Sequence, residues 1–149
     1  MVGYVTVDEA NEYVRSHYTA NENEMIAWNA LNDADHEIVL RRAFEQIEAL
    51  PYRGIPLGKS EFPRKGMDEV PLTVKHAQIE QALHGLTEPL NQSVDMFARG
   101  VSSFSIDDYS EELLDISKNP NSVYTQAGIT SYRVIGLLRP YVSGGFRIE

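Results

Sequence analysis

The sequence contains no cysteine, and this absence excludes several kinds of chemistry. Without thiols the chain has no disulfide framework, no cysteine nucleophile and no cysteine-based zinc site. No apolar run approaches the roughly 18 residues that a membrane-spanning helix needs. No apolar segment follows Met1, so we expect neither a secretion signal nor a membrane anchor.

Positive charge is also scarce, with 13 Lys and Arg residues against 22 Asp and Glu residues and a net charge of -9. Proteins that hold nucleic acid neutralise its phosphates with Lys and Arg, and most carry a basic surface. The acidic total therefore argues against strong binding of free DNA, although a local basic patch could still bind. An acidic protein would also suit a wall past which DNA slides without sticking. Charge alone does not separate these two interpretations.

Catalytic and cofactor motifs are missing as well. The sequence has no Walker A loop, no G-x-G-x-x-G, no G-x-S-x-G elbow and no H-E-x-x-H. We therefore expect a protein that is not an enzyme and binds no cofactor.

What the sequence does contain is helical periodicity. Thr6 followed by Glu9 forms a capping box, and Pro51 ends the third helical pattern. With 149 residues, of which 42% are hydrophobic, we predict one mainly α domain, a bundle of four to five helices over residues 1–140. The predicted helices cover residues 7–18, 22–31, 33–50, 71–90 and 131–138. The apolar positions expected to face the core are Ile38, Val39, Phe44, Ile47 and Leu50 in the third helix, and Leu72, Ile79, Leu83, Leu86 and Leu90 in the fourth.

The C-terminal half is less regular. Residues 101–106 alternate between apolar and polar side chains, which predicts a short extended or β arm. Residues 107–116 are acidic and predict at most a helical turn. A glycine pair precedes Phe146 and Ile148, so we expect residues 141–149 to be a flexible C-terminal arm that docks through apolar side chains.

A long loop between the third and fourth helices is the most informative stretch. Prolines and glycines punctuate residues 51–71, and long loops in compact domains are usually functional because ordering them costs entropy. Four basic side chains gather there in an otherwise acidic protein: Arg53, Lys59, Arg64 and Lys65. We interpret this basic loop as a contact surface, with a merely solvated loop as the alternative.

Two clusters of possible metal ligands carry less weight. His76, Glu80 and His84 are spaced by four and would share a helix face, as part of a metal site requires. A polar stripe on an amphipathic helix explains them more simply. A second set is acidic, but it lacks the ligand spacing and the glycine of a calcium loop, so we interpret it as a solvated face. Its members are Asp107, Asp108, Glu111, Glu112 and Asp115.

Aromatic side chains offer one more candidate site. Trp28, with Tyr13 and Tyr18 nearby, could stack on the bases of a single strand. Aromatic residues at helical spacing more often belong to a hydrophobic core, and we favour that interpretation.

A series of short motifs resembles the small connector proteins of tailed bacteriophages, which adapt the head to the tail and complete the head. Members of this group are sometimes labelled DnaT-like single-stranded DNA-binding proteins. The order and spacing of the motifs carry the resemblance over most of residues 1–90 and the last dozen or so. The motifs are Tyr4 to Tyr13, Trp28, Arg41 to Ala43, Leu50 to Gly54, Phe62 to Arg64, Val70-Pro71, Val74 to Leu83, Leu137 to Tyr141 and Gly144-Gly145.

The resemblance implies a structural virion protein made in the host cytoplasm. Such proteins form an oligomeric ring, twelve-fold to match the portal, at the neck between head and tail. The partners would be the portal above, a stopper or tail-completion protein below, and genomic DNA passing without sequence-specific binding. The basic loop would contact a neighbouring subunit. The arm that grips the portal would use Tyr141, Gly144, Gly145, Phe146, Arg147 and Ile148.

The alternative follows from the label itself, a phage replication protein that binds single-stranded DNA. It would use the basic loop together with Trp28 or Tyr52 as stacking surfaces, and its affinity would fall steeply with salt.

Overall fold

The computed structural model describes residues 1–98 and 122–143. Regular structure in this part of the chain is helical, with six α-helices, one 3-10 helix and no strand, which confirms the prediction of a mainly α fold. The elements are α1 (Val7–His17), α2 (Asn23–Asn29), α3 (Asp33–Glu48), α4 (Leu72–Ala98), α6 (Ser122–Gln126), α7 (Tyr132–Leu138) and η1 (Arg139–Tyr141). The arm predicted for 101–106 and the acidic turn predicted for 107–116 lie outside the described residues.

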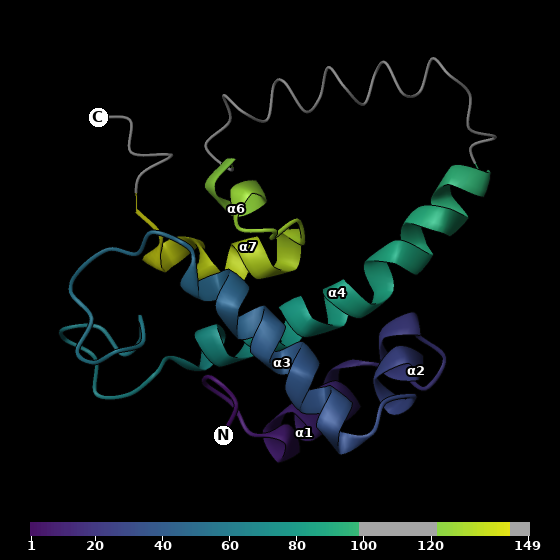
Figure 1. Ribbon diagram of the computed structural model, residues 1–149, viewed down its shortest axis with the longest axis horizontal. Helices are drawn as coiled ribbons and strands as arrows, with labels where there is room; N and C mark the ends of the chain where they lie inside the picture. The colour runs from purple at the N-terminus through teal and green to yellow at the C-terminus, as the bar shows by residue number, and fades with distance from the viewer. Residues whose placement is uncertain (99–121, 144–149) are drawn as a thin grey trace.

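Helices α3 and α4 cross in the middle of the molecule (Figure 1). Helices α1 and α2 lie on one side of this pair, and α6 and α7 lie on the other. The basic loop connects α3 to α4 at the end of the molecule near η1. None of the helices in the described part of the chain combines the length and apolar character needed to span a bilayer.

Local sequence explains where the helices begin. Thr6 Oγ1 accepts a hydrogen bond from Glu9 N at 3.0 Å, and Glu9 Oε1 accepts one from Thr6 N at 2.8 Å, so the predicted capping box is present. Asn32 caps α3 through Asp35 N at 2.8 Å. Each cap satisfies amide groups that the first turn of a helix leaves without partners.

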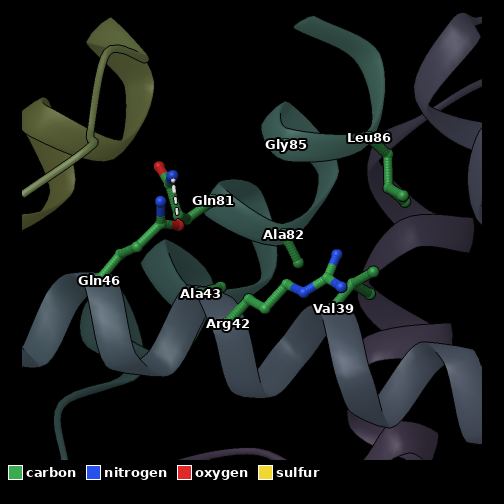
Figure 2. Close-up of a pocket in the computed structure, with 8 residues that line it drawn as sticks. All are labelled: Val39, Arg42, Ala43, Gln46, Gln81, Ala82, Gly85 and Leu86. Carbon is green, nitrogen blue, oxygen red and sulfur yellow. Dashed lines mark hydrogen bonds between the residues drawn. The ribbon is translucent and has the colours of Figure 1, made fainter. Parts of the chain in front are cut away.

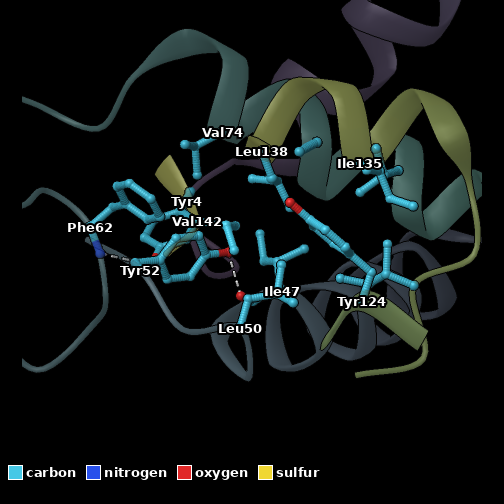
Figure 3. Close-up of a cluster of buried hydrophobic side chains, with 13 residues drawn as sticks. Tyr4, Ile47, Leu50, Tyr52, Phe62, Val74, Tyr124, Ile135, Leu138 and Val142 are labelled. Atoms are coloured by element: carbon cyan, nitrogen blue, oxygen red, sulfur yellow. Dashed lines mark hydrogen bonds between the residues drawn. The ribbon is translucent and has the colours of Figure 1, made fainter. Parts of the chain in front are cut away.

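One hydrophobic cluster lies between α3, α4 and the C-terminal elements and is called the loop-side cluster here (Figure 3). The Tyr52 hydroxyl donates to Ile47 O at 2.5 Å, and Phe62 N donates to the Tyr4 hydroxyl at 3.0 Å. Tyr4 also donates to the Glu48 carboxylate, whose pKa burial raises above its usual value. The loop-side cluster consists of Tyr4, Ile47, Leu50, Tyr52, Phe62, Val74, Ala77, Tyr124, Ile129, Val134, Ile135, Leu138 and Val142.

A second cluster, the helix-side cluster, fills the space between α1, α2, α3 and α4. The buried side chain of Gln78 lies between the two clusters and fastens the N-terminal segment to α3. Its Nε2 donates to Val2 O at 2.8 Å and to Leu40 O at 3.0 Å, while its Oε1 accepts from Tyr4 N at 2.9 Å. The helix-side cluster consists of Val2, Val5, Ala10, Tyr13, Val14, Met25, Trp28, Leu40, Ala43, Ile79, Ala82 and Leu83.

The apolar faces differ in part from those that the spacing predicts. Ile38 is 44% exposed, whereas Leu40 is fully buried. Leu72 is 65% exposed because it is the first residue of α4, where the chain enters from the loop. Helix α4 also continues beyond the predicted end at Leu90 and reaches Ala98.

Candidate nucleic-acid interface

The basic loop is held by backbone pairing at two places. Residues 55–57 pair antiparallel with 63–65, where Lys65 N donates to Ile55 O at 2.7 Å and Leu57 N donates to Pro63 O at 3.1 Å. The start of the loop pairs with the segment after η1, where Arg53 N donates to Tyr141 O at 2.8 Å. The second pairing brings Arg53 beside η1, although the two are far apart in the sequence.

Arg64 fastens the loop from the inside. Its side chain is 5% exposed, and its guanidinium donates to four backbone carbonyls. Nε reaches Arg53 O at 2.6 Å, Nη1 reaches Glu61 O at 2.9 Å, and Nη2 reaches Gly54 O at 2.7 Å and Tyr52 O at 3.4 Å. Nη1 also pairs with Glu61 Oε1 at 2.7 Å. A planar guanidinium with five donors suits such a set of acceptors, and an ammonium would not.

Three of the four predicted contact residues are therefore presented outward. Arg53, Lys59 and Lys65 are exposed, whereas Arg64 is engaged with the loop itself. Gly54 supports this arrangement, because its φ of +89° favours glycine and its carbonyl accepts from Arg64.

A second arginine joins Arg53 from the C-terminal region. Arg139 begins η1, and both guanidiniums lie close enough to Tyr124 to influence its hydroxyl. Burial raises the pKa of Tyr124, whereas the nearby positive charges of Arg139 and then of Arg53 oppose that rise. The fold thus gathers two cations, Arg53 and Arg139, at the end of α7.

The aromatic residues named as stacking candidates are occupied within the fold. Trp28 is 2% exposed, stacks on His36 with ring centroids 4.0 Å apart, and donates from Nε1 to Asn11 Oδ1 at 2.8 Å. Tyr13 and Tyr52 are also buried. The core interpretation of Trp28 and Tyr13 is therefore confirmed, and Tyr52 belongs to the core as well.

Tyr132 is the aromatic residue that the sequence analysis did not single out. Its side chain is 86% exposed on α7, seven residues before Arg139. The available signal was this spacing, which places two residues on one helix face.

The three residues weighed as metal ligands have separate protein partners. The His76 ring lies 4.6 Å from that of Tyr13, and burial, followed by the charge of His17, lowers the His76 pKa. The Glu80 carboxylate accepts from the Tyr13 and Tyr18 hydroxyls at 2.5 and 2.6 Å. His84 Nε2 lies 2.9 Å from Thr130 Oγ1.

A small pocket of about 160 Å³ lies between α3 and α4 (Figure 2). Arg42 extends along one side, and a pair of carboxamides closes the other, where Gln81 Nε2 donates to Gln46 Oε1 at 2.9 Å. Gln81 Oε1 has no hydrogen-bond partner among the described residues, but it is sealed from solvent, so an entering ligand cannot reach it. The pocket is also below the size of typical small-molecule sites, about 300 Å³ and above. We assign it no ligand.

Comparison with known proteins identifies the family. A family model described as "Putative DnaT-like ssDNA binding protein" matches residues 3–148. This match spans nearly the whole chain, so the protein belongs to that family. Neither the curated proteins nor the solved structures gave a match.

The family match overturns the connector interpretation. It names single-stranded DNA and gives no support to a virion ring under a portal, so the portal, the tail-side partner and the twelve-fold assembly are wrong as predictions. The motifs suggested the wrong partners because their residues stabilise the fold. Tyr4 and Glu9 fix the N-terminal segment and Arg64 fixes the loop, and residues of this kind indicate a fold without indicating a partner.

The portal is therefore wrong as the partner of the predicted arm, and nothing tests whether the arm docks elsewhere. Residues 144–148 lie outside the described residues. Tyr141 is half-buried in η1, and its hydroxyl lies 2.8 Å from Thr73 Oγ1 at the start of α4.

Proposed function

We propose that this protein binds single-stranded DNA through the surface formed by the basic loop and the end of α7. The observation that supports it most is the hydrogen bond from Arg53 N to Tyr141 O at 2.8 Å, which places Arg53 beside η1 and its first residue Arg139, in a chain of a family described by single-stranded DNA binding. Lys59 and Lys65 extend the positive surface along the loop. Proteins that bind single strands combine such a positive surface with exposed aromatic side chains.

The net charge of -9 is compatible with this local surface, because two of the nearby acidic groups are already engaged, whereas Asp68 and Glu69 of the same loop are exposed. Glu61 pairs with the buried Arg64, and Glu48 accepts from Tyr4. The loop therefore presents its lysines and Arg53 with part of the opposing charge compensated. The acidic remainder of the surface repels phosphate and would restrict contact to this patch.

The experiment is a titration of labelled oligo(dT) followed by fluorescence anisotropy at several salt concentrations. The logarithm of the association constant should fall with the logarithm of salt concentration, by about 0.7 for each phosphate that the protein neutralises. In the double variant Arg53→Ala with Arg139→Ala, the slope should become shallower by about 1.4.

Arg15→Ala provides the matched control. Arg15 is exposed on α1, on the other side of the α3 and α4 pair, and pairs only loosely with Glu12 at 3.9 Å. This variant should bind oligo(dT) as the unaltered protein does. Absence of salt-dependent binding in the unaltered protein would refute the proposed function, and equal losses in the control and the double variant would refute the assigned surface.

A further inference from the structure

The paired segments 55–57 and 63–65 of the basic loop form a short hairpin with two different faces. Pro56 lies directly opposite Arg64 in this hairpin. Side chains alternate between the two faces along each segment, and residues opposite each other share a face. Because the Arg64 side chain is buried against the loop, the residues on either side of the Pro56–Arg64 pair face outward. This outward side, called the hairpin face here, carries Ile55, Leu57 and Lys65.

The exposure of these side chains agrees with this pairing. Ile55 is 60% exposed and Leu57 is 59% exposed, and Lys65 is exposed beside them. The two aliphatic side chains are two residues apart on one face, so they form one apolar surface rather than two scattered positions. An exposed apolar surface bordered by polar residues is typical of a binding site, and packing within this fold does not explain it.

The backbone of the hairpin is closed to a further strand on both edges. Pro56 has no N–H, so the outer edge of 55–57 lacks the donor that a pairing strand would need. On the other edge, Arg64 N donates to Met67 Sδ at 3.5 Å, and Arg64 O accepts from Met67 N at 2.9 Å. A peptide or a second copy of this chain therefore cannot extend the hairpin by strand pairing. Recognition at this place depends on the side chains of the hairpin face.

Two lysines accompany the apolar pair. Lys65 shares the hairpin face, and Lys59 lies in the turn of the hairpin. Both side chains are exposed, and within the described part of the chain neither has an ion pair or a hydrogen bond. The acidic residue of the turn, Glu61, pairs with the buried Arg64, and the next acidic residues, 68–69, follow the hairpin. The hairpin face therefore suits a partner that is both anionic and apolar.

A DNA single strand is such a partner, because its unstacked bases expose their faces beside the phosphates. We propose that the hairpin face is a base-binding subsite, in which one base packs on Ile55 and Leu57 beside the phosphates that the two lysines bind. This inference rests on the proposed function and adds a location for the base, which that function does not assign. Aliphatic side chains pack on the face of any base, as the apolar wedges of DNA-bending proteins do. The subsite should therefore show little sequence preference.

The decisive comparison is between oligo(dT) and an abasic oligomer of the same length, each titrated with the whole chain. The double variant Ile55→Ser with Leu57→Ser should lower affinity for oligo(dT) by roughly 10- to 150-fold, the range expected for losing the burial of one aliphatic side chain. It should leave affinity for the abasic strand unchanged. The dependence of log affinity on log salt should also stay as in the unaltered protein, because the phosphate contacts remain.

A lysine variant should give the complementary result. Lys59→Ala with Lys65→Ala should weaken binding of both oligomers and make the salt dependence shallower by about 1.4. Ile26→Ser is the matched control, because it removes another exposed aliphatic side chain, on α2 and away from the loop. This control should bind both oligomers as the unaltered protein does. Thermal unfolding of every variant separates a lost contact from a lost fold.

The outcomes distinguish this inference from the proposed function. If the unaltered protein binds no single-stranded DNA, the proposed function fails and the subsite fails with it. If it binds, and the Ile55 and Leu57 variant either binds oligo(dT) equally well or loses affinity for both oligomers alike, the subsite alone is refuted. An anionic membrane is the other partner that this face could fit, tested with vesicles of phosphatidylglycerol and phosphatidylcholine. If the variant loses binding to these vesicles but keeps its affinity for oligo(dT), the hairpin face is a membrane contact and the subsite is likewise refuted.

Discussion

Arg64 in the basic loop and Glu80 in α4 are both buried charges, but they are satisfied in different ways. Arg64 is 5% exposed and Glu80 is 4% exposed. The partners of Arg64 lie within 12 residues in sequence and are four backbone carbonyls of its own loop and the Glu61 carboxylate. The partners of Glu80 are side chains from other elements, the hydroxyls of Tyr13 and Tyr18 and the guanidinium of Arg133.

This difference determines what each charge holds in place. The carbonyls around Arg64 are fixed to the backbone, so without the guanidinium they would have to find other donors or lose their hydrogen bonds. The tyrosine hydroxyls around Glu80 can rotate, and Tyr18 is only half-buried, so some of them can turn toward water. We infer that Arg64 shapes the loop that carries the proposed DNA-binding cations, whereas Glu80 joins helices that already pack through apolar side chains.

The largest expected effect is the loss of Arg64. Arg64→Ala should lower the free energy of unfolding by about 3–5 kcal/mol, because it leaves buried polar groups without their charged partner. Arg64→Lys should recover little of this free energy, since one ammonium cannot donate to all the carbonyls arranged around a planar guanidinium. Urea denaturation followed by circular dichroism measures both.

Lys65→Ala is the matched control for this variant, because Lys65 is the neighbouring residue and its side chain is exposed. The free energy of unfolding of Lys65→Ala should differ from that of the unaltered protein by no more than about 0.5 kcal/mol. A loss of less than 1 kcal/mol in Arg64→Ala, by the same denaturation, would show that water replaces the guanidinium and that the loop does not depend on it.

A smaller effect is expected at Glu80. Glu80→Gln keeps an acceptor for the tyrosine hydroxyls but removes the charge that faces Arg133, so the free energy of unfolding should fall by about 1–2 kcal/mol. Tyr13→Phe should lower the free energy of unfolding more than Tyr18→Phe does, because Tyr13 is buried and Tyr18 is half-exposed. A double-mutant cycle between Glu80 and Tyr13 gives their coupling energy directly. Coupling near zero would mean that the short hydrogen bond of 2.5 Å contributes nothing to stability.

The basic loop around Arg64 and the helices around Glu80 also differ in how much of their structure the sequence predicts. Helix starts depend on residues three apart, so the capping box of Thr6 and Glu9 was recognisable from a local pattern. The basic loop was recognisable from its composition, but the burial of Arg64 was not. That burial depends on carbonyls that converge only once residues 55–57 pair with 63–65.

The proposed site was harder still to predict. Arg53 and Arg139 meet because residues 51–53 pair with 141–143, which no local pattern encodes. Ile38 was predicted to face the core, and Tyr132 lies in the predicted helix 131–138, but both side chains are exposed. A helix of seven residues such as α7 has too few positions for periodicity alone to tell its exposed face from its buried one, and packing against α4 decides it.

The smallest expected effect is the pH dependence of stability that His76 contributes near Glu80. Burial, and then the charge of His17, lowers the pKa of His76, while Glu80 opposes the shift. In the unfolded chain the imidazole should titrate near its ordinary value of about 6.5. The folded protein therefore binds fewer protons than the unfolded chain just below that pH, so the stability contributed at neutral pH is lost as pH falls through the folded-state pKa.

Replacing His76 should flatten this part of the pH profile. Because the ring is partly solvated, the change should be well below the roughly 1.4 kcal/mol that a shift of one full pKa unit would give. Urea denaturation of His76→Gln between pH 7 and pH 5 measures it. Glu80→Gln should act in the opposite direction, since removing the carboxylate lowers the His76 pKa further and steepens the loss. If Glu80→Gln left the NMR titration of the His76 ring unchanged, the charge buried in α4 would not reach this surface, and its role would be confined to the two tyrosines and Arg133.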